Sequence, residues 1–461
     1  MMFEKLLKWI RNMLGTYFEE SKAPATDIII SSSMEAKLSE WARMYEGQKE
    51  KKSTVNPIGL AASICAEFAR LVTMECVIAV TGSPRADYIA QQINRIDLTP
   101  CTELACAFGG LVFKPFVSDN SVVIDIVQGD CFYPTAFDST GSLTGAIFAD
   151  QIIRNKKVYT RLEKHDYING SHRIENIAFE SSSSASIGSE ISLESIPEWT
   201  DIAPFLEIPD CDRPLFSYFK MPFQNTIDRH SPLGVSVFSR AEQLIRDADE
   251  QYGRYLWEFE GGELAVDAAA DYLMTTAEGT PVLPKGKGRL FRGLTTRDQN
   301  FYHIFAPALR DESLKRGFNT ILQRIEFQCG LAYGTLSDPT TVEKTAEEIR
   351  TSKARSYNTV KSIQKKLESA LSDLIYAVDK LATVYSLAPA GEYRTAFDWD
   401  DSILNDPEAV RARFERLMIA GKFPLWRYLV EFEGYTEDEA KAIQSESSSL
   451  VGDPYVDPTV S

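Results

Sequence analysis

A long stripe of apolar residues near the C-terminal third of the chain most limits what this sequence can fold into. Within residues 341–386, seven apolar side chains recur at intervals of three and four positions: Val360, Ile363, Leu367, Leu371, Leu374, Val378 and Leu381. This spacing predicts one long α-helix with a single apolar face. We therefore expect this helix to pack against the rest of the protein along its length.

Two more predicted helices flank a segment of different character. The first runs from Val235 to about Phe259 and ends at Gly261-Gly262, and the second runs from Ala308 to about Gln328 with Gly330 as its stop. Between them, glycines and prolines interrupt residues 263–305 and leave room only for short strands. The order helix, compact mixed module, helix is the most distinctive pattern of the chain.

The N-terminal half is rich in β-structure. Two apolar runs flank the turn at Ser118-Asp119-Asn120, and a second turn, Asp138–Gly141, joins strands predicted at 132–137 and 143–148. Further strands are predicted at 157–165 and 167–179, followed by an exposed loop from Ser181 to Ser184 and beyond. Helices are predicted at 60–74, 407–420, 424–432 and 436–446, and the last residues, 447–461, read as disordered. The fold class is therefore α+β.

The chain is acidic, with 66 Asp and Glu against 49 Lys and Arg and a net charge of -17. Tight binding of phosphates to a broad basic surface is thus disfavoured. An acidic wall suits a channel through which a polyanion slides, but acidity that serves only solubility explains the composition equally well.

The seven cysteines are scattered and the four histidines form no cluster with ligand spacing, so we expect neither a metal nor another cofactor, and reduced thiols. No segment is apolar enough over about 20 residues to cross a membrane. The first 15 residues contain Glu4, Lys5, Lys8 and Arg11, which favours an amphipathic helix over a signal peptide.

Sequence motifs for catalysis are not convincing. The chain has no Walker loop, and the cluster Pro284–Gly288 lacks the spacing of one. Carboxylate groups such as Asp247/Asp249/Glu250, Asp400/Asp401 and Glu347/Glu348 could hold a metal or exchange protons, although solvated helix faces explain them better. We expect the protein not to be an enzyme.

Several segments, in chain order, resemble the portal proteins of long-tailed bacteriophages. Near the start, Trp41 and Tyr45-Glu46-Gly47 precede Val55–Gly59, and Ala107–Pro115 resembles the glycine-led hairpin of the family. The sharpest similarity is Pro214–Lys220, then Asn225, Pro232–Phe238, Asp247 and Asp249. Leu309-Arg310, Gly334–Ser337 and Lys344–Ile349 continue it, with Thr-Ala-Glu-Glu-Ile where the family commonly has a Thr-Ala-Thr-Glu type of stretch. Together they extend from about residue 40 to 445.

The resemblance implies an elongated subunit with four parts. It assigns 1–233 to a β-rich wing, 234–260 and 307–330 to the two helices of a stem, 261–306 to a small α/β clip, 331–385 to a channel loop and a long wing helix, and 386–461 to a helical crown with a flexible tail.

The resemblance also implies roles for particular residues. Leu336, Ser337, Asp338, Pro339 and Thr340 would form the loop that projects into the channel. Lys344, Arg350 and Lys353 could contact the DNA backbone, or could instead pair with Glu347 and Glu348 along a helix. Candidates for exposure on the first stem helix are Asp247, Glu250 and Arg254, and candidates for packing are Leu244, Ile245, Tyr252, Tyr255 and Leu256.

The implied function is that of a ring at one capsid vertex of the virion, expected to be a dodecamer, through which double-stranded DNA enters and leaves. Implied partners are the large subunit of the terminase, a head–tail adaptor, the major capsid protein and the scaffold, without a membrane. Alternatives from other classes are another virion structural protein, such as an adaptor or capsid subunit, and an enzyme such as a nuclease that uses Asp247 and Asp249.

Overall fold

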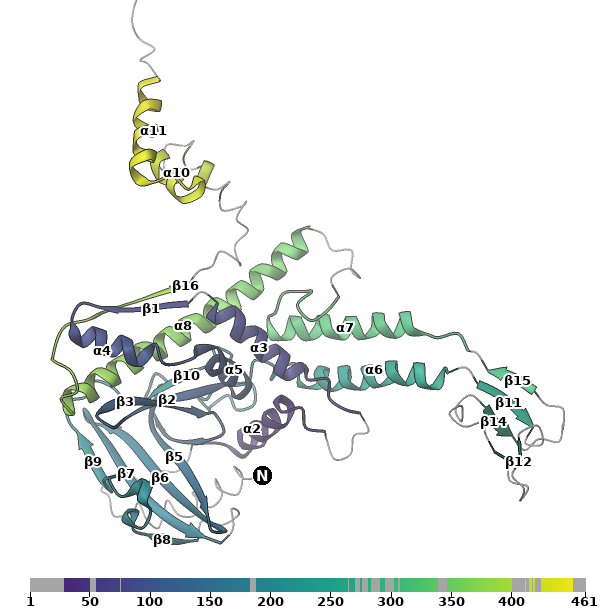
Figure 1. Cartoon of the computed structure of the whole chain (residues 1–461), viewed down its shortest axis with the longest axis horizontal. Helices are drawn as coiled ribbons and strands as arrows, with labels where there is room; N and C mark the ends of the chain where they lie inside the picture. The colour runs from purple at the N-terminus through teal and green to yellow at the C-terminus, as the bar shows by residue number, and fades with distance from the viewer. Residues whose placement is uncertain are drawn as a thin grey trace, which may run out of the picture. The chain divides into compact units, whose positions relative to one another are not determined.

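The computed structural model describes residues 29–49, 55–74, 76–182, 188–263, 265–269, 274–275, 281–282, 291–294, 302–305, 307–338, 346–399, 411, 414–416, 418 and 424–450. These residues form two compact units, residues 1–398 and 399–461. The amphipathic helix predicted for the first 15 residues lies outside the described residues. Helices and sheets both contribute to the first unit (Figure 1), in agreement with the predicted α+β class.

The helices of the first unit are α2 (Ser32–Tyr45), α3 (Leu60–Thr73), α4 (Pro84–Ile93), α5 (Leu98–Phe108), α6 (Glu242–Gly261), α7 (Asp311–Cys329) and α8 (Ala346–Val384), with two short 3-10 turns, η1 (Leu193–Ser195) and η2 (Pro197–Trp199). Its strands are β1 (Cys76–Thr81), β2 (Gly110–Ser118), β3 (Ser121–Gln128), β4 (Phe132–Phe137), β5 (Leu143–Arg154), β6 (Lys157–Ile168), β7 (Ser171–Ser181), β8 (Ser189–Ile191), β9 (Phe205–Ile208), β10 (Ser217–Lys220), β11 (Ala265–Ala269), β12 (Met274–Thr275), β13 (Pro281–Val282), β14 (Phe291–Leu294), β15 (Tyr302–Phe305) and β16 (Arg394–Trp399).

The largest sheet has six antiparallel strands in the order β4-β5-β6-β7-β8, with β9 also paired to β7. The turn between β6 and β7 differs from the prediction, which broke the strands at Asp166. The break lies instead at Asn169-Gly170, where φ is +51° and +78°. Asn and Gly tolerate this left-handed conformation, so the pair makes the tight hairpin turn. Ser181, predicted in a loop, is the last residue of β7.

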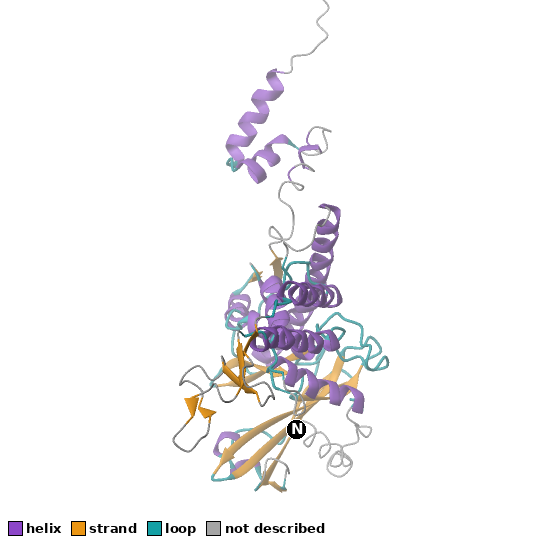
Figure 2. Ribbon diagram, turned by 90° about the vertical axis from the view of Figure 1, so that its right-hand side faces the viewer, coloured by secondary structure: helices purple, strands orange, loops and turns teal. Residues whose placement is uncertain are grey.

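A second sheet, β10-β2-β3, faces the first one. Its hairpin turns at Asp119 and Asn120, both with positive φ, as the sequence predicted. An apolar cluster drawn from both sheets fills the space between them: Val112, Val127, Phe132, Leu143, Ala146, Phe148 and Phe216. Figure 2 shows this β-structure below the helices of the same unit.

Helix α8 packs against this body, as its apolar stripe predicts. Six of the seven stripe residues are completely buried and Leu381 is 5% exposed. Strands β10 and β2 and helices α3 and α4 contact the helix. Two hydrogen bonds join α8 to its neighbours: Ser217 of β10 donates to the carbonyl of Ala370, and Gln364 donates to the carbonyl of Val72. The predicted single long helix is therefore confirmed over residues 346–384, and its apolar stripe, residues 360–381, packs against the rest of the fold as predicted.

The first helix of the predicted pair begins later than expected. Residues 235–241 are not helical, and α6 starts at Glu242. Val237 donates its N–H to the carbonyl of Cys106, and the Ser236 hydroxyl donates to the same oxygen. Because Val235 and Phe238 are fully buried against the body, tertiary packing outweighs the helical periodicity of this segment. Helix α7 likewise starts later than predicted, at Asp311, and ends at Cys329, with Gly330 (φ +84°) as its C-cap.

Residues 394–399 also depart from the prediction of a helical end. They form β16, which pairs with β1 although more than 300 residues separate them in the chain. In the second unit, α10 (Leu425–Glu433) and α11 (Glu437–Leu450) pack on each other. Residues 447–450 are thus helical, and the rest of the tail lies outside the described residues, as does most of the predicted helix at 407–420.

Two further predictions concern membrane-spanning segments and the redox state of the cysteines. Within the described ranges, no helix is both long and apolar enough to cross a membrane. All seven cysteines are described and none is paired in a disulfide. Burial raises the pKa of most of these thiols, for example to about 11 for Cys76 and to about 12 for Cys329, so they are weak nucleophiles.

Candidate functional site: the paired helices α6 and α7

Helices α6 and α7 form an antiparallel pair, side by side in both views (Figures 1 and 2). The rings of Tyr252 and Phe318 lie 5.7 Å apart in the middle of the pair. Near the end of α6, Glu258 accepts hydrogen bonds from the backbone N–H and the guanidinium of Arg310, with Nη2–Oε2 at 2.7 Å. This hydrogen bonding lowers the pKa of Glu258. The end of α6 is thereby fixed to the start of α7.

Two small sheets connect the two helices. The chain leaves α6, forms β11, β12, β13, β14 and β15, and then enters α7. The strand order is β14-β11-β15, with β11 parallel to β14 and antiparallel to β15, and β12 pairs with β13. Short strands between two helices agree with the order predicted from the sequence, while the described residues between α6 and α7 contain strands only, so the predicted α/β character of the module stays a prediction.

Large apolar side chains are exposed where α6 meets α7. Leu256, Trp257 and Phe259 in the last turns of α6 are 48%, 63% and 40% exposed, and Leu309 beside them is 41% exposed. Leu309 belongs to the same place, because a Cβ on Gly262 would lie 2.5 Å from its Cδ2. We call these four residues the helix-end cluster. Leu256, which was predicted to pack, is therefore exposed, whereas Ile245 is buried as predicted. Large exposed apolar side chains gathered at one helix end are typical of contact sites for other molecules.

The polar residues predicted for the first helix are distributed around it. Glu250 and Arg254 are exposed and lie 3.6 Å apart across one turn. Asp247 accepts a hydrogen bond from Gln243 at 2.9 Å. Exposure is therefore found for Glu250 and Arg254, while Asp247 is only half-exposed.

The alternative of a nuclease site on α6 finds no support in the geometry. Asp249 accepts the backbone N–H of Ile58 at 2.9 Å, and burial raises its pKa. Asp247 bonds instead to Gln243, along its own helix. In the part of the chain that the structure describes, no three His, Cys, Asp or Glu side chains converge as ligands for a metal ion.

The segment after α7 is held by a buried carboxylate. Glu326, completely buried, accepts hydrogen bonds from the backbone N–H groups of Gly334, Leu336 and Ser337 and from the Ser337 hydroxyl. Asn319 accepts the N–H of Asp338 at 2.7 Å. Leu336, Ser337 and Asp338 thus lie against α7 and do not project from it. Pro339 and Thr340, the rest of the predicted channel loop, lie outside the described residues.

The basic residues predicted near DNA stand at the start of α8. Lys344 lies outside the described residues, Arg350 is in the first turns of α8, and Lys353 is exposed. The sequence-based alternatives for them, contact with phosphates or pairing with neighbouring glutamates, both stay predictions.

Sequence reasoning missed a buried network between the two sheets. Lys114 of β2 donates to Glu163 of β6 at 2.8 Å, and Arg161 donates to the same oxygen at 3.0 Å. Ring nitrogens of His165 lie 2.7 Å from Glu163 and 2.9 Å from His172. The sequence feature that could have predicted this network is Asn169-Gly170. A hairpin turn at this pair places two histidines, seven residues apart in the chain, on the same face of the sheet.

The partners of the two histidines fix their tautomers. The backbone N–H of Leu215 points at Nδ1 of His172, at 3.4 Å, so Nε2 of His172 carries the proton and donates to His165. His165 then donates from Nε2 to Glu163. Both rings are neutral in this chain of bonds, and burial lowers the pKa of both. Burial opposes ionisation of Glu163, but His165, Lys114 and Arg161 together lower its pKa well below the usual value.

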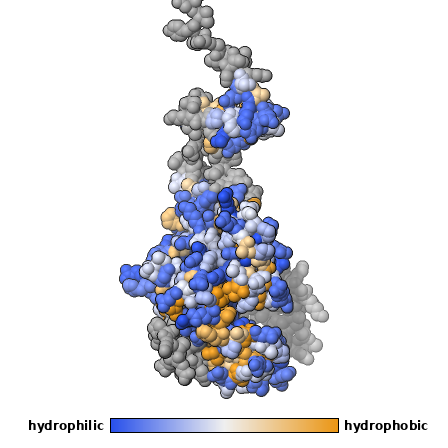
Figure 3. All heavy atoms as spheres, turned by 90° about the vertical axis from the view of Figure 1, so that its left-hand side faces the viewer, coloured by the Kyte–Doolittle hydropathy of each residue, from blue (hydrophilic) through white to orange (hydrophobic). Residues whose placement is uncertain are grey.

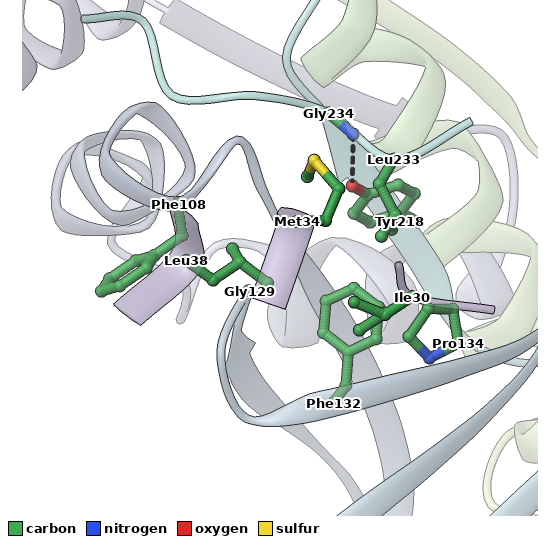
Figure 4. Close-up of a pocket in the computed structure, with 10 residues that line it drawn as sticks. All are labelled: Ile30, Met34, Leu38, Phe108, Gly129, Phe132, Pro134, Tyr218, Leu233 and Gly234. Atoms are coloured by element: carbon green, nitrogen blue, oxygen red, sulfur yellow. Dashed lines mark hydrogen bonds between the residues drawn. The ribbon is translucent and has the colours of Figure 1, made fainter. Parts of the chain in front are cut away.

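A small cavity beneath α2 is too small to be a ligand site (Figure 4). It is lined by apolar side chains from α2, α5, β4 and β10, and Tyr218 accepts the Gly234 N–H at 3.1 Å at its edge. Its volume of about 10 Å³ is at most that of one water molecule. The helix pair therefore stays the candidate site.

Comparisons with known proteins gave no assignment. No protein-family model matches the chain, and a search of curated proteins found no significant match.

Proposed function

We propose that this chain is a portal subunit of a tailed bacteriophage, which assembles into a ring through which DNA passes. The observation that carries the proposal is the antiparallel pair α6 and α7, joined by a compact β module and left with exposed apolar side chains in the helix-end cluster. The resemblance of the sequence segments supports the same function.

A closed ring explains why this apolar surface is tolerated. In cyclic symmetry, one surface of each subunit contacts a different surface of the next, and closure leaves no open end. Trp257, Leu256 and Leu309 would then be covered by the next subunit, while Glu250 and Arg254 stay in water. Two helices per subunit, repeated around an axis, make the wall of a tube.

The wall would guide DNA without chemistry of its own. With a net charge of -17, the chain as a whole repels a polyanion, which favours sliding over tight binding. ATP hydrolysis would come from a terminase that docks on the β11–β15 module, and a head–tail adaptor would bind the same surface after packaging. The virion is the proposed location.

The β-rich body would provide the contacts with the capsid and scaffold proteins. Figure 3 shows hydrophobic side chains gathered over the lower part of the first unit, within a mainly hydrophilic surface. Exposed apolar residues of the two large sheets include Phe116, Val123, Ile153 and Phe205. Such side chains suit contact with other proteins.

Negative-stain electron microscopy of the purified full chain tests the proposal. We expect a ring with a central hole wide enough for duplex DNA. Mass photometry is expected to give the mass of about twelve subunits. A stable monomer under assembly conditions would contradict it, and so would a compact particle without a bore. The second outcome would favour an adaptor or shell subunit.

A further inference from the structure

A basic segment of α8 stands out in this acidic chain. Residues 350–367 contain six basic residues and no Asp or Glu: Arg350, Lys353, Arg355, Lys361, Lys365 and Lys366. A groove with a volume of about 510 Å³ opens along this segment, between α8 and Pro222-Phe223. Its α8 wall consists of Thr351, Ala354, Arg355, Asn358, Thr359 and Ser362, which recur at helical spacing and so form one face.

Arg355 is held rigidly in the wall of this groove. Its guanidinium carbon lies 4.8 Å from the ring centre of Phe327 and 5.0 Å from that of Tyr333. One of its nitrogens donates to the carbonyl of Leu331 at 3.0 Å. No carboxylate lies within salt-bridge distance of this guanidinium among the described residues. Among the side chains that the structure describes, the cation is therefore positioned without a counter-ion.

Two lysines, Lys220 and Lys366, lie beyond the Ser362 end of the groove. Strand β10 lies along α8, because the two elements are in contact, Ser217 donates to the carbonyl of Ala370, and Pro222 and Ser362 both line the groove. Between these points, Lys220 of β10 lies close enough to Lys366 for their charges to repel. Burial, and then this repulsion, lowers the pKa of Lys220. Neither ammonium has a carboxylate partner in the described part of the chain.

We propose that this groove binds the phosphodiester backbone of DNA, an inference that rests on the proposed function for the identity of the polyanion. Arg355 and Lys366 are eleven positions apart, which is about 16 Å along a helix. A single phosphate cannot reach both ends, whereas a chain of phosphates can. Threonine, serine and asparagine side chains between the cations are frequent phosphate ligands.

The test is binding of a short labelled duplex to the full chain over a series of NaCl concentrations. In the double variant Lys220→Gln/Lys366→Gln, we expect about tenfold weaker binding at low salt and a salt slope smaller by about two, since each lost phosphate contact removes about 0.9. The matched control is Lys157→Gln, which removes an exposed lysine on a distant strand and is expected to keep the slope.

Several outcomes would overturn the inference. One is an unchanged salt slope in the double variant. A second is a poly-glutamate peptide that binds the wild type more tightly than the duplex does and loses this binding in the double variant, because the occupant would then be an acidic protein segment. A third is full displacement of the duplex by inorganic phosphate at matched ionic strength, which indicates a site for one phosphate.

Two further measurements keep the result interpretable. If the double variant does not fold, Lys366→Gln alone changes only an exposed side chain and should reduce the slope by about one. Electron microscopy of the same samples separates the two proposals. Rings with an unchanged slope would refute the groove alone, whereas a reduced slope without rings would refute the portal function alone.

Discussion

The space between the two large sheets and the end of the α6–α7 pair differ in how polarity and burial are combined. Between the sheets, the charges of Lys114, Glu163 and Arg161 are taken out of water and bonded to one another. At the helix end, Leu256, Trp257 and Leu309 are apolar yet left in water. The first region is complete within one subunit. In the proposed ring, a neighbouring subunit would cover the second region, which is why we place the assembly contact there.

The largest effect is expected from breaking the buried network. Glu163→Ala leaves Lys114 and Arg161 without their shared carboxylate in a buried site, and removing one partner of such a pair costs about 3–5 kcal/mol. Urea denaturation of the purified chain measures this loss. Glu180→Ala is the matched control, because Glu180 pairs with Lys157 at the exposed end of the same sheet. Equal losses in the two variants would contradict the role given to the network.

The histidines of the network predict a pH dependence. Burial lowers the pKa of His165 and His172 in the folded chain, so the unfolded chain binds more protons below its ordinary histidine pKa of about 6.5. The free energy of unfolding should therefore be level above that pH and fall below it, by up to about 2.7 kcal/mol per pH unit for two protons.

Denaturant titrations between pH 5 and pH 8 measure this slope, within the range where histidine titrates. His165→Gln/His172→Gln should lose most of it while being less stable at neutral pH. His230→Gln, which changes an exposed histidine, should keep it. A slope that survives in the double variant would assign the pH dependence to other groups.

Substituting Trp257 in the helix-end cluster should have the smallest effect on the stability of the monomer and the clearest effect on assembly. Trp257→Ser removes a side chain that is 63% exposed, so the monomer should unfold almost as before. Assembly should weaken at least tenfold, about 1.4 kcal/mol for each contact, as measured by mass photometry over a dilution series. Ile153→Ser, at another exposed apolar position, is expected to assemble normally. Loss of assembly in that control instead would move the interface to the sheets.

Local patterns were sufficient wherever one element sets its own structure. The turn at Asp119-Asn120, the stop at Gly330 and the stripe from Val360 to Leu381 were all predicted and confirmed. In each case the signal lies within a few residues: a left-handed turn, a helix cap, or an apolar face of period 3.6. Helix or hairpin formation at these places needs no information from distant segments.

Predictions failed where distant segments compete for the same residues. Val235–Phe238 has helical spacing, yet the carbonyl of Cys106, about 130 residues earlier, accepts hydrogen bonds from Ser236 and Val237, and the segment is not helical. Strand β16 exists because β1 offers an edge. The proximity of His165 to His172 followed from a turn that was placed three residues too early.

The sequence by itself determined the turn at Asp119-Asn120, the apolar face of α8 and the order of two helices around a module of short strands, because these depend on spacing along one chain. Only the tertiary structure decided that Glu326 anchors Leu336 and Ser337, that two histidines share one proton chain with Glu163, and that Lys220 meets Lys366. Such groups come together through packing of strands and helices far apart in sequence, and their charges matter only once water is excluded or a groove has formed.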